Sequence, residues 1–248
     1  MNIRKVRDLT LVDLDQGKTM VIACDSCGSV GLKEGDVLKV SPFITGKYTA
    51  RVAILEVLCT GAEVICLTNT ICNEMEPTGK AIIQGIEEEL KEAGIGKVVL
   101  TGSTEENFST VATGIGITVI GLVATKDLKV NNIKADALLI ALGQPKVGQA
   151  VLESKREDII DYSIIKQLLQ AEEVYEIIPV GSKGILYEMQ ELARNNQLKL
   201  SVNDNIRVDI HKSAGPSTAV IVAASNNYFS KMDIAVSVEL LGKVSRKI

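Results

Sequence analysis

The sequence predicts an α+β protein with two domains. Short apolar runs typical of strands are mixed with helical repeats, without the regular alternation of a doubly wound sheet. The chain carries neither a Walker-type phosphate loop nor a GxGxxG fingerprint. Its 248 residues suffice for two domains, and the pattern breaks in TKDLKVNNIKA, residues 125–135. We therefore expect an N-terminal domain over 1–125 and a C-terminal α+β domain over 126–248.

Composition excludes several classes of function. Hydrophobic residues make up 46% and charged residues 23%, which is typical of soluble globular proteins. A net charge of -4 with three Phe and no Trp argues against a nucleic-acid partner. The apolar runs 115–124 and 137–142 are too short to span a bilayer, and the charged start does not resemble a signal peptide. We expect a cytoplasmic protein that binds neither nucleic acid nor membrane.

The five cysteines do not form a disulfide framework. Cys24 and Cys27 make one CxxC, but a second such pair is missing and the single histidine, His211, lies far along the chain. Reduced cysteines that are partly in the core are the expectation, with a structural metal as the weaker alternative.

The first strands lead into a glycine-rich segment. Residues 9–15 alternate like an exposed strand, and the stronger strand 19–24 runs into Asp25 and then DSCGSVGLKEGD. Gly28 and Gly31 allow a ligand to approach the backbone closely, and Lys33 adds a positive charge. The alternative is a glycine-rich connection whose polar residues are merely solvated.

A helix, strand, loop and helix follow. The first helix covers 48–59, with Glu56 at the edge of its apolar stripe, and a strand is expected over 63–68. The loop TNTICNEMEPTG contains Asn69 and several acids, and Pro77 is well suited to open the second helix.

The segment TGSTEENF, residues 101–108, has two interpretations. It follows a short strand over 97–100 and precedes a central strand over 114–124. Ser103 with Glu106 three residues later fits a capping box, which predicts a helix start. Alternatively, Glu105 or Glu106 helps to hold a hydrated magnesium ion.

The second half mixes both kinds of element. The patterns predict helices at 147–155, 161–172 and 184–195, and strands at 137–142, 174–180, 198–202, 219–224 and 234–241.

Several motifs together resemble a known superfamily. It comprises aminoimidazole ribonucleotide synthetase, thiamine monophosphate kinase, selenophosphate synthetase and a hydrogenase maturation factor. Asp25 before GSVGLK is similar to the superfamily's aspartate and GVGTK-like element, and Glu56 falls where thiamine monophosphate kinases carry an aspartate. The segment TGST, 101–104, resembles a GGDT or GGET turn before a strand of TVIG type, here 118–121.

The resemblance implies a synthetase-like fold whose N-terminal sheet pairs with that of a second subunit in a homodimer, with Mg²⁺ and ATP as cofactors. The variant motifs EMEPTG and TGSTEENF look most like α-ribazole kinases, which implies phosphorylation of the 5′-hydroxyl of α-ribazole in cobalamin lower-ligand salvage. Implied magnesium ligands are Asp25, Glu56 and one of Glu105 or Glu106, and Lys33 or Arg51 is implied to contact phosphate. Implied nucleotide contacts are Asp25, Gly28, Gly31, Lys33, Asn69, Gly102, Ser103 and Thr104.

Departures from the superfamily keep two alternatives open. Ser103 stands where an acid is usual, and Lys183 stands where many members carry Asp before Gly. Besides an α-ribazole kinase, the chain could therefore be another ATP-dependent enzyme acting on a thiamine or purine intermediate, or a nucleotide-binding protein without catalysis. The motifs identify neither a general base nor the number of metal ions.

Overall fold

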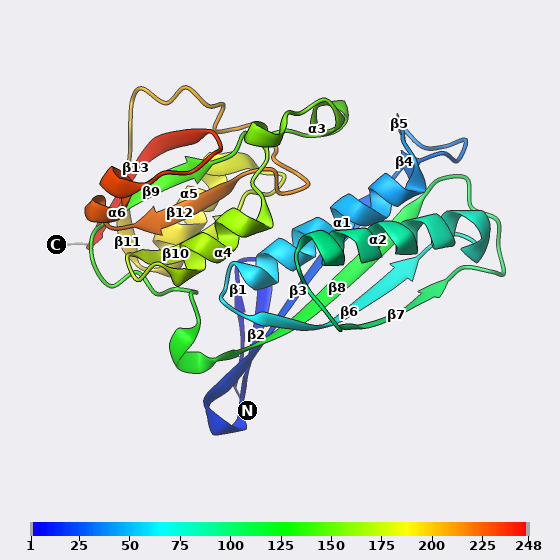
Figure 1. The fold of residues 1–248 in the computed structure, drawn as a ribbon, viewed down its shortest axis with the longest axis horizontal. Coiled ribbons are helices and arrows are strands. Elements are labelled where there is room, and N and C mark those ends of the chain that lie inside the picture. The colour runs from blue at the N-terminus through cyan, green and yellow to red at the C-terminus, as the bar shows by residue number, and fades with distance from the viewer. Residues whose placement is uncertain (1, 247–248) are drawn as a thin grey trace. The chain divides into compact units, whose positions relative to one another are not determined.

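A computed structural model describes residues 2–246 and divides the chain into two compact units. The first comprises the residues up to Leu58 together with Ala62–Thr125, and the second comprises Cys59–Gly61 and the residues from Lys126 onward. Each unit combines one mixed or antiparallel sheet with helices (Figure 1), so the predicted α+β class is confirmed.

The first unit is built on a six-stranded sheet of order β1-β2-β3-β8-β6-β7. Only the pair β6 and β7 is parallel. Its strands are β1 (Asn2–Val6), β2 (Leu9–Leu14), β3 (Lys18–Gly28), β6 (Glu63–Ile71), β7 (Val99–Thr104) and β8 (Gly114–Ala124). A small parallel pair, β4 (Val30–Gly31) and β5 (Leu38–Lys39), lies in the glycine-rich segment.

Two helices, α1 (Pro42–Leu58) and α2 (Lys80–Glu92), cover one face of this sheet (Figure 1). Strand β8 alternates strictly, with Ile115, Ile117 and Val119 buried and the residues between them half-buried. The two helices cross closely at Gly46 and Gly85. A Cβ at either position would overlap the backbone of the other helix, so this close approach needs glycine.

The sequence predicted most of these elements but not all. Strand β1 was not expected, and helix α1 begins at Pro42 rather than at residue 48. Pro77 does not open α2, because a single wide turn over Met75–Gly79 precedes the helix. The helix start at Ser103 was also wrong: β7 continues to Thr104, paired in register with β6.

The second unit contains a five-stranded antiparallel sheet of order β10-β12-β9-β13-β11. Its strands are β9 (Ala137–Leu142), β10 (Val174–Pro179), β11 (Leu198–Val202), β12 (Val220–Ala224) and β13 (Val238–Arg246), and its helices are α3 (Gln149–Leu152), α4 (Tyr162–Gln170), α5 (Gly184–Asn195) and α6 (Asn226–Lys231). The apolar stripe Ile185, Met189 and Leu192 of α5 is fully buried in this unit's core. Of the described strands and α-helices of this unit, α6 alone was not predicted.

Among residues 2–246, the helices are all too short or too polar to cross a membrane.

Candidate functional site

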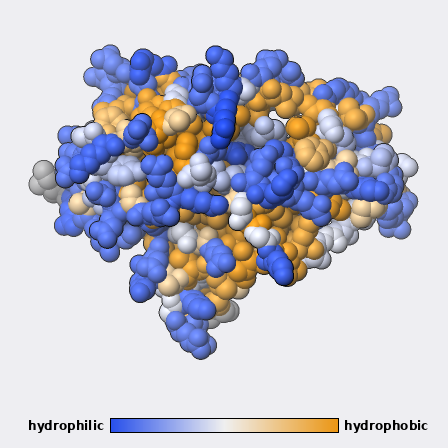
Figure 2. Space-filling view, viewed as in Figure 1, coloured by the Kyte–Doolittle hydropathy of each residue, from blue (hydrophilic) through white to orange (hydrophobic). Residues whose placement is uncertain are grey.

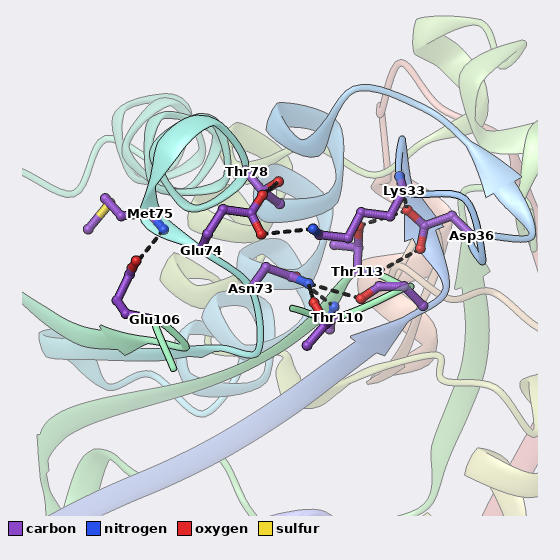
Figure 3. Close-up of polar contacts among 11 residues, drawn as sticks. Lys33, Asp36, Asn73, Glu74, Met75, Thr78, Glu106, Thr110 and Thr113 are labelled. Atoms are coloured by element: carbon purple, nitrogen blue, oxygen red, sulfur yellow. Dashed lines mark hydrogen bonds and ion pairs between the residues drawn. The ribbon is translucent and has the colours of Figure 1, made fainter. Parts of the chain in front are cut away.

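Three loops of the first unit meet at one end of the strands β3, β6, β7 and β8 (Figure 3). They are residues 29–37 after β3, residues 72–79 after β6 and residues 105–113 between β7 and β8. We call their polar residues Lys33, Asp36, Asn73, Glu74 and Thr113 the loop cluster.

Asp36 ties the glycine-rich loop to the start of β8. Its carboxylate accepts hydrogen bonds from the backbone N–H and the hydroxyl of Thr113, both at 2.7 Å, and from the N–H of Lys33 at 2.8 Å. Burial alone would raise the pKa of Asp36, but these hydrogen bonds outweigh it and hold the pKa below its ordinary value. A Cβ on Gly31 would overlap Asp36 and Thr113, which explains why this position is a glycine.

Asn73 joins the other two loops in the same way. Its fully buried side chain donates to Thr110 and, at 2.9 Å, to the carbonyl of Ala112, while its oxygen accepts from the N–H of Gly114 at 3.0 Å. Asp36 and Asn73 together hold all three loops in one arrangement.

Lys33 and Glu74 form an ion pair across two of these loops. Lys33 Nζ lies 2.8 Å from Glu74 Oε2, with 20% and 33% of the two side chains exposed. The hydroxyl of Thr78 donates to the other carboxylate oxygen. Burial acts to raise the pKa of Glu74, but the hydrogen bonds from Lys33 and Thr78 lower it overall.

Glu105 and Glu106 organise the backbone of the neighbouring loops. Glu106 accepts from the N–H of Met75 and the hydroxyl of Thr104, both at 2.8 Å. Glu105 accepts from the N–H groups of Asn107 and Phe108, and these hydrogen bonds lower its pKa. Both predicted metal ligands therefore already have hydrogen-bond donors from the chain.

A second group of charges, which we call the turn cluster, consists of Arg7, Asp8, Asp25 and Glu56. Arg7 adopts a left-handed backbone (φ 53°) in the turn between β1 and β2, and its guanidinium lies 3.7 Å from the carboxylate of Glu56 on α1. Burial raises the pKa of Asp25 to about 6, and the negative charge of nearby Asp8 adds to the rise. The structure thus brings Asp25 and Glu56 to the same turn.

The two clusters are neighbours along β3. Burial raises the pKa of Cys27, and the charges of both Asp25 and Asp36 raise it further, so Cys27 lies within electrostatic range of each cluster. Its thiol is hydrogen-bonded to Thr49 on α1, which places Cys27 on the helix-covered face. Alternation along the strand places Asp25 on that face and Cys24 on the opposite one.

Several predicted residues lie outside these clusters. Arg51 is buried between α1 and α2, where its Nη1 lies 3.3 Å from Glu89. Asn69 is buried and packs on Gly102, where a Cβ would overlap it, while its amide donates to the carbonyl of Thr101. Gly28 and Ser103 are exposed at the loop edge of the sheet.

The second unit holds Lys183, which departs from the superfamily pattern, and His211, the single histidine. Lys183 precedes α5 and lies 4.2 Å from the ring centre of Tyr187. His211 is exposed in the loop that packs on Gly184. All five cysteines are free.

Arg7 and Asp8 were missed from the sequence. Residues 2–6, NIRKV, show no clear apolar alternation, so the hairpin whose turn carries these charges was not expected. Its register, with Val6 opposite Leu9, brings the turn beside β3.

The described side chains offer few ligands to a metal ion. Across residues 2–246, His, Cys, Asp and Glu side chains form no group of three placed to hold a cation. Mg²⁺ bound to phosphates needs only one or two carboxylates, because phosphate oxygens and water complete its six ligands. The hairpin register places Asp8, in the turn after β1, next to the part of β3 that carries Asp25, and the negative charge of Asp8 contributes to the raised pKa of Asp25. These two carboxylates fit that requirement, because a cation relieves their repulsion.

Comparison with known proteins confirms the resemblance drawn from the motifs. Residues 7–123 match the family model of the AIR synthase related protein, N-terminal domain. A comparison with curated protein sequences found no match.

Solved structures share the fold over nearly the whole chain. A HypE–HypF complex is 18% identical with a TM-score of 0.67, over 97% of this chain and 87% of that one. AaThiL complexed with AMPPCP and TMP is 11% identical with a TM-score of 0.66, and the match covers 97% of this chain and 85% of AaThiL. T. maritima PurL complexed with ADP is 14% identical with a TM-score of 0.68; the match covers 99% of this chain but only 43% of PurL. The chain therefore shares the fold of these solved structures, and residues 7–123 match the AIR synthase related family model.

Proposed function

We propose that this chain is an ATP-dependent phosphotransferase that converts α-ribazole to α-ribazole 5′-phosphate. The observation that carries the proposal is the hairpin register, which brings Asp8 to the strand that carries Asp25 and leads into the loop with the partly exposed Lys33. The fold supports it, because structures with this fold were obtained with ADP and with AMPPCP.

Asp8 and Asp25 are the residues proposed to hold Mg²⁺. The ion, when bound with ATP, neutralises charge on the phosphates. Glu56 is assigned a different task from the one that the resemblance implied, since Arg7 already supplies its positive charge. Glu105 and Glu106 are proposed to stabilise the loop backbone, because their carboxylates accept hydrogen bonds from its N–H groups.

Lys33 is the proposed contact for a phosphate oxygen. Its ammonium has three donors, and Glu74 is the one side-chain partner that it has among residues 2–246. The other two donors are available to an anion. Arg51 is not carried into the site, because it is buried against Glu89.

The proposed reaction is a direct phosphoryl transfer. The 5′-oxygen of α-ribazole forms a bond to the γ-phosphorus, the bond from that phosphorus to the β,γ-bridging oxygen breaks, and ADP leaves. The hydroxyl proton passes to solvent. Such a transfer depends mainly on positioning and on charge neutralisation, which Lys33 and the two aspartates provide.

The proposed partner is a second copy of the chain. On the sheet face opposite α1 and α2, the apolar residues Met20, Ile22, Ile120 and Leu122 are half-buried. Pairing of two such faces would remove these residues from water. Figure 2 shows the other side of this unit, covered by α1 and α2, where hydrophilic and apolar residues are mixed at the surface.

Substrate-dependent ADP release tests the proposal. Purified protein with ATP and Mg²⁺ should release ADP when α-ribazole is added, and much less with thiamine monophosphate or aminoimidazole ribonucleotide precursors. Lys33→Met should lose most of this activity, whereas Lys80→Met, which removes an exposed lysine on α2, should not. ADP release with another acceptor alone would favour a different enzyme of this fold; ATP binding without ADP release would favour a non-catalytic protein.

A further inference from the structure

We infer that Glu74 is a positioning residue that holds the Lys33 ammonium ready for a nucleotide phosphate. The inference rests on the proposed function, because it assigns Lys33 to an anion. It adds a role for three residues, Glu74, Thr78 and Asp36, that the metal and phosphate assignments do not use.

The side chain of Lys33 is held in one position but stays accessible. A lysine has a flexible four-carbon stem and loses rotamer entropy when it binds a ligand. The 2.8 Å contact with Glu74 fixes the ammonium across the gap between two loops, while 20% of the side chain stays exposed. The ammonium is therefore held in place but not closed off from solvent.

The carboxylate of Glu74 is itself held in a fixed orientation. Glu74 Oε2 faces Lys33, and Oε1 accepts the hydroxyl of Thr78. Figure 3 shows Glu74 between these two side chains. The backbone carbonyl of Glu74 also accepts the N–H of Gly79 at 2.9 Å, which closes the turn that carries both Glu74 and Thr78. Thr78 and the turn thus fix the direction of the carboxylate.

The loop that carries Lys33 is anchored by Asp36. Asp36 binds the N–H of Lys33 and both donors of Thr113, so the backbone under the lysine is anchored to the start of β8. With both the backbone and the ammonium of Lys33 fixed, a phosphate meets a preorganised donor, which costs less entropy than recruiting a mobile side chain.

A binding experiment with three single variants tests the inference. The probe is AMPPCP with Mg²⁺, titrated calorimetrically into the full chain. Glu74→Gln keeps the shape of the side chain but removes the charge, and we expect binding about tenfold weaker, the scale of one lost charge-assisted hydrogen bond. Thr78→Val should weaken binding by about threefold, since it acts through one neutral donor. Glu88→Gln alters a partly exposed acid on α2 that pairs with Lys91; it is the matched control and should bind like the wild type.

A double-mutant cycle separates positioning from a general effect on folding. Glu74→Gln should have little effect in a Lys33→Met background, because the group that it positions is gone. Equal weakening in both backgrounds would overturn the inference, as would a folded Glu74→Gln that binds within twofold of the wild type. If Glu74→Gln does not fold, Thr78→Val decides by the same cycle. Failure of the wild type to bind AMPPCP at all would refute the proposed function instead.

Discussion

The guanidinium of Arg7 lies 3.7 Å from the carboxylate of Glu56, and only 5% and 12% of the two side chains are exposed. The superfamily motif implied that Glu56 binds magnesium, but in this chain a protein cation occupies that neighbourhood. Arg7 stands beside Asp8 in the same turn, so one residue compensates the charge of Glu56 while the next faces Asp25. We infer that the arginine takes over part of the charge neutralisation for which a metal ion would otherwise be needed.

Glu56→Gln is expected to destabilise the protein by about 3 kcal/mol, because removing one partner of a buried pair leaves the other charge uncompensated. Urea denaturation measures this loss. The variant should keep its Mg²⁺-dependent affinity for AMPPCP within about threefold, whereas loss of a direct metal ligand should weaken that affinity by about tenfold or more. Complete loss of that affinity in a folded variant would restore Glu56 to the metal site.

Asp25→Asn is expected to change stability and binding in opposite directions. Without metal, the neutral amide avoids the burial cost of the carboxylate and the repulsion from Asp8, so the melting temperature should rise. Mg²⁺-dependent binding of AMPPCP should fall by about tenfold or more. Asp15→Asn, which alters an exposed aspartate next to β2, serves as the control and should change neither quantity.

Arg51→Met is expected to reduce stability without altering nucleotide binding. The arginine links α1 to Glu89 on α2, and its loss leaves a fully buried carboxylate with Lys47 at 3.9 Å as a remaining cation. We expect a loss of about 3 kcal/mol in the free energy of unfolding. A folded variant with unchanged stability but weakened AMPPCP binding would show that Arg51 contacts phosphate after all.

Asp36→Asn is expected to remove part of the acid sensitivity of the fold. The pKa of Asp36 lies below its ordinary value of 3.8, so its carboxylate stabilises the folded state above that pH and loses this contribution as the pH falls through the lower folded value. The wild type should therefore exceed the variant in stability at pH 6, and the difference should shrink towards pH 3. Urea denaturation at both pH values measures this difference in the free energy of unfolding. A difference independent of pH would contradict the stabilising role of the ionised Asp36 carboxylate.

Strong periodic patterns explain which elements the sequence predicts correctly. Strand β8 alternates over its whole length, β9 is a continuous apolar run, and α5 has a clear apolar stripe, so their boundaries agree with the structure. The segment at Ser103 shows the limit of local signals. Its capping box is a valid local motif, but the ladder between β6 and β7 keeps the backbone extended.

Contacts between distant residues explain what the sequence does not predict. Arg51 and Glu89 are 38 positions apart and meet because the glycines Gly46 and Gly85 let the two helices cross closely. Asp8 approaches Asp25 through the register of a hairpin whose first strand has little apolar pattern. Residue type and spacing point to Asp25 and Lys33 as functional, but their partners follow from the fold.

Transfer of label from [γ-³²P]ATP tests the central claim most directly. With Mg²⁺ and α-ribazole, the wild-type protein should produce labelled α-ribazole 5′-phosphate in a one-to-one ratio with ADP, and Asp25→Asn should produce almost none. Label that stays in ATP, or that appears only as inorganic phosphate, would contradict the assignment of this chain as a phosphotransferase acting on α-ribazole.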